Sequence, residues 1–359
     1  MATDTGAARP QDFARRVTGW QATHGRSGLP WQGTRDPYRV WLSEIMLQQT
    51  QVATVLDYFP RFLDRLPDVR TLAEAPADEV LGLWSGLGYY SRARNLHKCA
   101  QKVMSDFGGE FPRTAEQLAT LPGIGRSTAA AIASFCFGER AAILDANVKR
   151  VLTRVMAYGA DLARPAAERA LWQVATELLP DGDAAELREE MPRYTQGLMD
   201  LGATVCVPRR PLCLLCPVED VCQAHAEGRQ EAYPVKTKTL KRSAESWWLL
   251  VVRDASGRVL LQRRPDSGIW AGLYCVPVFA DRAALDARLA QWTNAPAHDL
   301  PVFLHVLTHK DLHLHPVLAE LPAGGPLPVE EGDGVRWATA ADWVDIGLPT
   351  PLRRLLGEL

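Results

Sequence analysis

Residues 121–132 have the sequence LPGIGRSTAAAI and join two helical patterns through a short turn. Pro122 ends the first helix because its ring cannot continue the backbone hydrogen bonds. Gly123 and Gly125 can adopt positive φ and leave no side chain in the way of an approaching backbone. Ser127 opens the second helix, whose first N–H groups have no partner within the helix. Because such amides bind phosphate, the stretch predicts a phosphate-holding turn between helices; a plain connector is the alternative.

The chain on either side of this turn is predicted to be mostly helical, from about residue 10 to residue 225. Apolar residues recur there at a spacing of three to four, in the segments 38–58, 115–121, 127–137, 148–158 and 165–179. The pattern changes after Cys222. Short β-type runs occur at 247–252, 259–263, 273–279, 302–308 and 312–318, and one helix is predicted at 282–292.

The change in pattern predicts two domains. Residues 1–232 form a helical domain, and residues 246–359 form an α+β domain. Residues 233–245 are polar and basic, lack apolar periodicity and predict a linker.

Charge and hydrophobicity argue against two classes of protein: those that coat nucleic acid by bulk charge and those that span a membrane. The chain has 359 residues with 47% hydrophobic and 23% charged residues, as soluble globular proteins do. A net charge of −2 argues against a protein that coats nucleic acid by bulk charge alone, although a local basic face remains compatible with it. No apolar run approaches the ~18 residues of a membrane span, and the start shows no secretory signal. We expect a monomer without a membrane partner, in the cytoplasm and associated with the nucleoid.

Four of the seven cysteines, Cys206, Cys213, Cys216 and Cys222, follow the spacing C-x6-C-x2-C-x5-C. Four thiolates of this kind can ligate a [4Fe–4S] cluster. A structural zinc ion is the alternative, but zinc sites more often pair two short C-x2-4-C units, and only one is present here. Coincidental buried cysteines are a third interpretation.

Two carboxylates are candidates for chemistry. Asp145 precedes a helical pattern, where an N-cap role alone would explain it. Glu44 lies in the polar patch of an otherwise apolar helix, where an exposed helix position would explain it. Cleavage of a glycosidic bond uses two carboxyl groups in different environments, one neutral to protonate the leaving group and one anionic near the sugar. The sequence leaves both interpretations open.

A third group of residues fits the extrusion of a base from duplex DNA. Leu87 and Tyr89 lie in Gly86-Leu87-Gly88-Tyr89-Tyr90 and offer an apolar and an aromatic wedge on a glycine-rich turn. Gln49 can hydrogen-bond to base edges from the opposite side. Ordinary core packing of Leu87 and Tyr89 is the alternative.

Taken together, segments spread over most of residues 20–225 resemble the MutY family of DNA glycosylases, in the endonuclease III superfamily. The matching segments are LPW at 29–31, SEIMLQQTQV at 43–52, WSGLGYYSRARNL at 84–96, LPGIGRSTAAAI at 121–132, LDANVKRVLTR at 144–154 and the cysteine spacing. The resemblance implies a mostly α helix–hairpin–helix glycosylase domain with a [4Fe–4S] module. The hairpin, with Gly123, Gly125 and the basic neighbour Lys149, is then expected to contact the DNA backbone.

The same resemblance implies roles for individual residues. Glu44 protonates adenine at N7 and later helps to activate water. Asp145 stabilises the resulting cation or captures it transiently, and Asn147 helps to orient the site. Trp31, Leu47 and Gln196 line the adenine pocket, and Arg26 is a further candidate. Ser127 stands beside the substrate where endonuclease III has its lysine nucleophile, so hydrolysis by water without a lyase step is expected.

Residues 246–359 resemble the C-terminal domain of the MutY family, a relative of the Nudix fold. The segment that would carry the magnesium-binding glutamates of a Nudix hydrolase, 281–292, contains no glutamate, so a binding role is expected. The family's 8-oxoguanine loop corresponds to Leu307-Thr308-His309, where Leu307 replaces an aromatic residue and Thr308 and His309 keep the polar groups. For the histidines at 305, 309, 313 and 315, surface positions or a metal site are the alternatives.

The sequence therefore predicts a monofunctional glycosylase that removes adenine mispaired with 8-oxoguanine or guanine in double-stranded DNA. Two other functions remain as alternatives. One is an endonuclease III-like glycosylase and lyase for oxidised pyrimidines, against which Ser127 and the second domain argue. The other is a lesion-binding protein without catalysis, against which Glu44 and Asp145 together argue.

Overall fold

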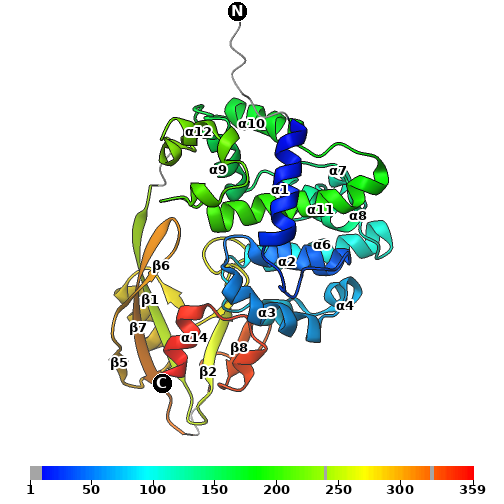
Figure 1. Ribbon diagram of the computed structural model, residues 1–359. Helices are drawn as coiled ribbons and strands as arrows, with labels where there is room; N and C mark the ends of the chain where they lie inside the picture. The colour runs from blue at the N-terminus through cyan, green and yellow to red at the C-terminus, as the bar shows by residue number, and fades with distance from the viewer. Residues whose placement is uncertain (1–9, 238–240, 324–326) are drawn as a thin grey trace, which may run out of the picture. The chain divides into compact units, whose positions relative to one another are not determined.

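The computed structural model describes residues 10–237, 241–323 and 327–359 (Figure 1). Contacts between residues divide the chain into two compact units. The first contains residues 1–63, 68–70 and 98–239, and the second contains 64–67, 71–97 and 240–359. The helical segment 71–97 therefore belongs with the C-terminal part of the chain, which differs from the linear division predicted from the sequence pattern. Among the described residues, no helix is long and apolar enough to cross a membrane.

The first unit is helical, as predicted. Its elements are α1 (Pro10–His24), α2 (Pro37–Leu47), α3 (Val52–Arg65), the end of α6 (Ser91–Phe107), α7 (Ala115–Leu118), α8 (Arg126–Phe137), α9 (Ala146–Val155), α10 (Pro165–Glu177), α11 (Ala184–Asp200), the π-helical turn η1 (Leu201–Val205), the 3₁₀ turns η2 (Cys213–Leu215) and η3 (Glu219–Val221), α12 (Gln223–Ala226) and the 3₁₀ turn η4 (Gln230–Ala232).

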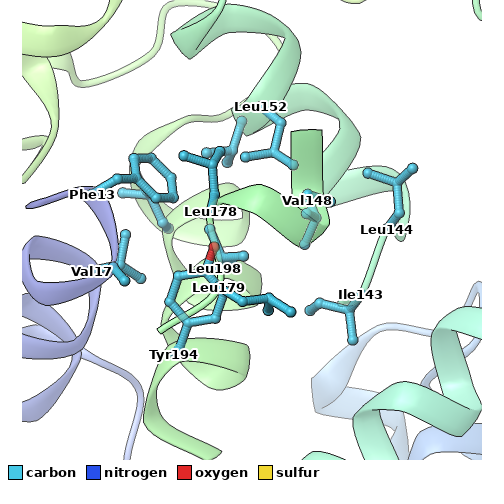
Figure 2. Close-up of a cluster of buried hydrophobic side chains, with 14 of the residues drawn as sticks. Phe13, Val17, Ile143, Leu144, Val148, Leu152, Leu178, Leu179, Tyr194 and Leu198 are labelled. Carbon is cyan, nitrogen blue, oxygen red and sulfur yellow. The ribbon is translucent and has the colours of Figure 1, made fainter. Parts of the chain in front are cut away.

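The core of this unit lies between α1, α9, α10 and α11 (Figure 2). Val148, Val151, Leu152 and Val155 occupy positions i, i+3, i+4 and i+7 of α9 and are buried, so one face of this helix turns inward. Side chains from α1 and α11 pack onto that face, among them Phe13, whose ring meets Tyr194 edge to face at 6.4 Å.

Helix α8 places the hairpin against this core. Residues 129–133, four of them alanine, are all buried, and their small side chains let α8 pack closely against α2 and α11. The helix ends at Gly138, which has φ +71. A Cβ atom there would lie 2.4 Å from Cα of Arg188, so only glycine fits this close approach.

One helix prediction was wrong in its extent. The segment 38–58 is not a single helix but divides into α2 and α3, with a break at residues 48–51. Gln49 has φ +55, a left-handed conformation that no helix interior contains. The apolar spacing carried across the break because both helices bury one face, so periodicity alone did not show it.

The second unit contains a mixed sheet in the order β3-β2-β1-β7-β5, with β4 paired to β1, β6 to β7 and β8 to β2. The strands are β1 (Ser243–Arg253), β2 (Val259–Arg263), β3 (Tyr274–Cys275), β4 (Val278–Phe279), β5 (Ala297–Asp299), β6 (Phe303–Val306), β7 (Lys310–Glu320) and β8 (Val335–Ala338). The helices of this unit are α4 (Val69–Glu74), α5 (Ala77–Leu83), the start of α6, α13 (Arg282–Trp292), η5 (Asp342–Val344) and α14 (Thr350–Gly357).

The two long strands β1 and β7 run parallel, from the pair Ser243 and Lys310 to the pair Arg253 and Glu320. The ladder therefore begins at Ser243, two residues before the predicted end of the linker at residue 245. Near the linker's start, Thr237 donates from its backbone N–H to Asp161 at 3.2 Å. Residues 238–240 of the predicted linker lie outside the described residues.

Segment 71–97 is fastened to the second unit by polar contacts. Ser85 Oγ and the hydroxyl of Tyr90 both donate to the backbone oxygen of Leu348, at 2.8 and 3.1 Å. Arg94 donates to the backbone oxygen of Ala271 at 2.6 Å. These bonds join residues more than 170 positions apart in sequence, which is why linear patterning did not assign the segment to this unit.

Candidate active site

A large pocket in the first unit gathers most of the predicted site residues. Its volume of about 1330 Å³ exceeds the ~300–1,000 Å³ typical of small-molecule sites, so it has room for an extruded nucleotide. The loop after α1, the end of α2, the break at 48–51, the start of α8, the start of α9 and one face of α11 form its walls. The predicted site residues that line it are Trp31, Glu44, Leu47, Gln49, Ser127, Asp145, Asn147 and Gln196.

Glu44 is presented by α2. Asp36 caps this helix by accepting from the Tyr38 N–H at 2.9 Å, and Trp41, Leu42 and Ile45 bury its inner face. Glu44 itself is half-buried in the pocket wall. Burial and then the nearby charge of Asp145 raise the pKa of Glu44 from its ordinary 4.5 to about 7. The carboxyl group can therefore carry a proton near neutral pH and release it to a bound base.

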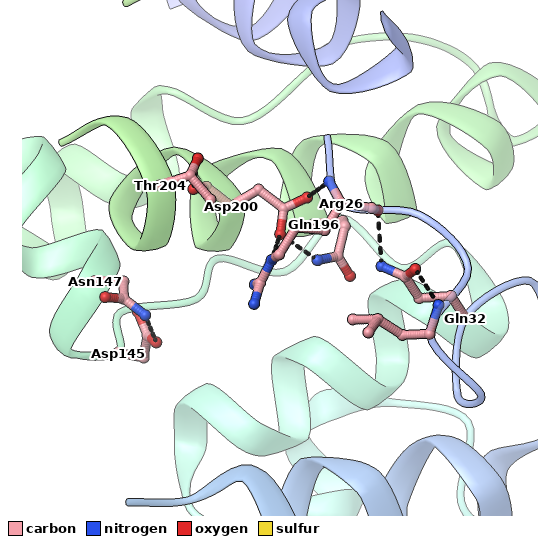
Figure 3. Close-up of polar contacts among 8 residues, drawn as sticks. Arg26, Gln32, Asp145, Asn147, Gln196, Asp200 and Thr204 are labelled. Carbon is pink, nitrogen blue, oxygen red and sulfur yellow. Dashed lines mark hydrogen bonds and ion pairs between the residues drawn. The ribbon is translucent and has the colours of Figure 1, made fainter. Parts of the chain in front are cut away.

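Asp145 caps α9, as the sequence predicted. Its Oδ1 accepts from the Val148 N–H at 2.7 Å, and its Oδ2 lies 3.5 Å from Nδ2 of Asn147 (Figure 3). The pKa of Asp145 is raised, because burial outweighs the backbone hydrogen bonds from Val148 and Asn147, which act in the opposite direction. Capping and pocket lining occur together, so the two interpretations of Asp145 are compatible.

The side chain of Asn147 is fixed by a hydrogen bond from Arg150, a residue that the sequence did not single out. Arg150 donates to Oδ1 of Asn147 at 2.8 Å, to the backbone oxygen of Gly202 at 2.6 Å and to that of Cys206 at 2.7 Å. A Cβ atom on Gly202 would lie 2.6 Å from Cβ of Asn147, so this close approach requires glycine. The start of α9 is thereby fixed to the backbone that leads into the cysteine loop.

The hairpin has the predicted form with two corrections. Gly123 has φ +77 as expected, but Gly125 has φ −82 and acts as the N-cap of α8, which begins at Arg126 and not at Ser127. No side chain caps this helix, and no atom lies within 4 Å of the place a Cβ on Gly125 would occupy. The amides at the start of α8 are thus open to an anion.

Ser127 and Lys149 have partners that the sequence did not reveal. The hydroxyl of Ser127 accepts from the backbone N–H of Leu144 at 3.0 Å, which ties the start of α8 to the residue before Asp145. Lys149 donates to Glu168 at 2.5 Å. That ion pair offsets part of the positive charge expected to meet the DNA backbone.

The predicted wedge lies in the second unit. Gly86 and Gly88 both have positive φ, and so does Tyr89 at +48. Leu87 is buried with 6% of its surface exposed, so the structure shows it packed, whereas Tyr89 is 44% exposed. Arg92 donates to the backbone oxygens of Leu87 and Gly88 at 3.1 Å and thereby fixes the turn.

Tyr89 meets the predicted lesion loop within the second unit. Its hydroxyl lies 2.7 Å from Oγ1 of Thr308. Thr308 and His309 are exposed in the turn between β6 and β7, which closes through a bond from the Leu307 N–H to the Lys310 oxygen at 2.8 Å. Two predictions made from separate parts of the sequence therefore come together at one place.

The predicted cysteine site is formed by a loop against α9 and η1. Cys206, Cys213, Cys216 and Cys222 all line one largely apolar pocket, and none forms a disulfide. Arg154 is buried beside them and donates to Sγ of Cys206 at 3.4 Å and to the backbone oxygens of Val207 and Pro208 at 2.7 and 2.9 Å. Across the part of the chain that the structure describes, no group of three or more His, Cys, Asp or Glu side chains is arranged to hold a metal ion.

The histidines of the second unit were the other candidates for a metal site. His315 stacks on Trp248 at 4.4 Å between ring centroids, and His305 lies 5.8 Å from the ring of Trp270. The described residues give the metal-site interpretation of these histidines no support. Helix α13 has the predicted bounds and contains no glutamate.

Comparison with known proteins agrees with this geometry. Residues 42–177 match the HhH-GPD superfamily of base excision DNA repair proteins, and residues 248–358 match the NUDIX domain. The adenine DNA glycosylase of Buchnera aphidicola is 34% identical over 96% of this chain and 96% of its own length. This chain belongs to the adenine DNA glycosylase family. The human adenine DNA glycosylase is also 34% identical, over 96% of this chain and 73% of its own length.

Solved structures support the fold of this family member. A thermostable thymine-DNA glycosylase is 29% identical over 61% of this chain and 97% of its own, with a TM-score of 0.53. A trapped endonuclease III–DNA covalent intermediate covers 62% of this chain and 99% of its own at 20% identity, with a TM-score of 0.50, and shows the fold alone. The prediction of a helix–hairpin–helix glycosylase with a Nudix-like second domain is confirmed.

Proposed function

We propose that this glycosylase hydrolyses the N-glycosidic bond of adenine mispaired with 8-oxoguanine, or with guanine, in double-stranded DNA. The observation that carries the proposal is the pairing of Glu44 and Asp145 in one pocket, with the pKa of Glu44 raised to about 7. An acid that is still protonated at neutral pH and a hydrogen-bonded carboxylate are the two groups that cleavage of a glycosidic bond requires.

The reaction follows from the positions of these groups. Glu44 donates its proton to the leaving adenine as the bond between the base and C1′ breaks, and the bonding electrons leave with the base. The sugar becomes an oxocarbenium ion, which the negative charge of Asp145 stabilises. Water then adds to C1′ and returns its proton to Glu44. Ser127 offers no amine, so no Schiff base forms and the DNA strand stays intact.

The rest of the molecule supplies DNA binding and choice of lesion. The open amides at the start of α8 bind a backbone phosphate without reading sequence. Tyr89, Thr308 and His309 form an exposed polar and aromatic group in the second unit, and we assign it to the base opposite adenine. Without an aromatic residue at Leu307, this group discriminates through the hydroxyl of Thr308 and the imidazole of His309.

The opposing base provides the test of this proposal. Single-turnover rates are measured on duplexes that hold adenine opposite 8-oxoguanine, guanine or thymine, and on one that holds thymine glycol opposite adenine. We expect the fastest release opposite 8-oxoguanine, slower release opposite guanine and none from the normal pair with thymine. Equal rates opposite thymine and 8-oxoguanine, or activity confined to thymine glycol, would refute the proposal.

The pKa of Glu44 predicts how the rate depends on pH. Glu44 must be protonated to act, and with a pKa of about 7 its acid form is present below pH 7 and is lost above it. The rate of adenine release should therefore fall by about tenfold per pH unit above about pH 7. It should also fall in acid, where Asp145 loses the charge that stabilises the cation. A single-turnover profile that stays level to about pH 9 contradicts this role of Glu44.

We further propose that Cys206, Cys213, Cys216 and Cys222 hold a [4Fe–4S] cluster. Four thiols around one apolar pocket suit such a group, and no carboxylate is needed to complete the set. The cluster would hold the loop 206–222 in place, in a pocket that shares no lining residue with the one that contains Glu44 and Asp145.

Iron content tests the cluster. The purified protein should absorb broadly in the visible range and contain about four iron ions per chain. Cys213→Ser should lose most of this iron, whereas Cys275→Ala, which removes a buried cysteine of the second unit, should retain it. A colourless protein with one zinc ion would contradict the assignment, because zinc is d¹⁰ and has no visible absorbance.

A further inference from the structure

Asp200, the last residue of α11, has a carboxylate that the chemistry above does not use. Its side chain is completely buried, at 0% exposure. Figure 3 shows the donors that surround it: Nε of Arg26 at 2.6 Å, the backbone N–H of Arg26 at 2.9 Å and Nε2 of Gln196 at 2.8 Å. A buried carboxylate is tolerated only with such partners, so the three bonds define the position of each group.

The bond to Gln196 fixes which end of its amide faces the pocket. A carboxylate only accepts hydrogen bonds, so the NH2 group of Gln196 must face Asp200 and the amide oxygen must turn away. Gln196 lines the large pocket, and no hydrogen bond among the described residues uses its Oε1. The pocket therefore presents an acceptor of fixed direction.

Arg26 is oriented by the same carboxylate. Its Nε donates a hydrogen bond to Asp200. Its terminal nitrogens make no hydrogen bond within the part of the chain that the structure describes. Arg26 also lines the pocket. One buried acid thus aims both an acceptor and a cationic donor at the space where a base would lie.

We propose that Asp200 is a positioning residue that makes the pocket select purines with a 6-amino group over purines with a 6-oxo group. An amino group donates to the fixed oxygen of Gln196. A 6-oxo group brings a second acceptor against that oxygen, so the two oxygens repel each other and form no hydrogen bond. This inference rests on the proposed function, and it names the residue that sets the polarity of the base pocket.

The test compares two bases opposite the same 8-oxoguanine. Single-turnover rates are measured for adenine and for hypoxanthine, which carries a 6-oxo group, and their ratio is the readout. In Asp200→Asn, a neutral amide no longer forces the orientation of Gln196, and the ratio should fall by about three- to tenfold. Asp200→Ser, which fits the same space, is the second variant in case the amide unfolds the protein.

A double-mutant cycle shows whether Asp200 acts through Gln196. Gln196→Leu should lower the ratio by a similar factor, and adding Asp200→Asn to it should lower the ratio no further. Thr195→Val is the matched control, because Thr195 is a buried neighbour on α11 bonded to Ser134 at 2.8 Å. It should lower the melting temperature and leave the ratio unchanged.

The outcomes separate this inference from the proposed function. If the wild-type protein releases no adenine, the proposed function fails. If it does, and the ratio in a soluble Asp200 variant equals that of the wild type, Asp200 does not set the selection. An additive fall in the double variant would likewise overturn the claim that Asp200 works through Gln196.

Discussion

Glu44→Gln should slow adenine release by about 10²–10⁴-fold, the range over which general acid catalysis contributes. Glutamine has nearly the shape of glutamic acid but carries no proton that it can transfer to the leaving base. In wild type, the raised pKa of about 7 keeps Glu44 protonated near neutral pH. The glutamine variant loses this proton donor but keeps the shape of the pocket. The rate is measured under single-turnover conditions, and duplex binding is measured separately by fluorescence anisotropy.

Glu190→Gln provides the comparison for this loss. Glu190 is an exposed acid on α11 that does not line the pocket, so the same chemical change there should leave the rate near that of wild type. Similar rates for Glu44→Gln and wild type would remove Glu44 from the mechanism. A loss of duplex binding that accounts for the whole fall in rate would make Glu44 a binding residue.

Asp145→Asn should slow the reaction by about 10²–10³-fold, as the removal of one electrostatic stabiliser of a transition state does. Asparagine keeps an oxygen that can accept from the Val148 N–H, so α9 should remain capped. What the variant lacks is the negative charge beside the sugar. Affinity for the duplex should therefore stay close to that of wild type while turnover falls.

Asp183→Asn separates charge from capping. Asp183 caps α11 through the N–H groups of Ala185 and Glu186, at 2.8 and 3.0 Å, and lies outside the pocket. It should retain wild-type turnover, since only the cap chemistry changes. Weak duplex binding with normal turnover in Asp145→Asn would show that Asp145 serves the fold or the DNA contact and not the cation.

The sequence predicted best what local rules decide. Helix α13 has the bounds expected from its pattern, and strand β2 matches the run at 259–263. The N-cap at Asp145 followed from one residue before a periodic segment. In each of these cases the side chains that determine the structure lie within a few residues of one another, so spacing was sufficient.

Other features depend on contacts between distant residues, which no spacing encodes. The left-handed Gln49 divides an apolar pattern that otherwise continues. Lys149 gains its partner Glu168 from another helix, and Leu87 is buried, whereas the sequence left a wedge and core packing both open for it. An acid four residues after Gln196, at the end of a helix, was the signal that the sequence offered for Asp200.

The catalytic roles of Glu44 and Asp145 were likewise not decided by the local pattern of residues. Capping alone explained Asp145, and an exposed helix position explained Glu44, so the pattern of residues left both open. The resemblance to a glycosylase family selected the catalytic interpretation. The structure adds a physical reason, because it brings both carboxyl groups to one pocket and raises the pKa of Glu44 through burial and the charge of Asp145.

The most direct test of the central claim is to detect the products of the wild-type protein on a duplex with adenine opposite 8-oxoguanine. Free base is identified by chromatography, and the strand is examined before and after treatment with alkali. The account predicts stoichiometric free adenine and a strand that breaks only after alkali, because hydrolysis at Glu44 and Asp145 leaves an intact abasic site. Strand breakage without alkali, or breakage without free adenine, would contradict it.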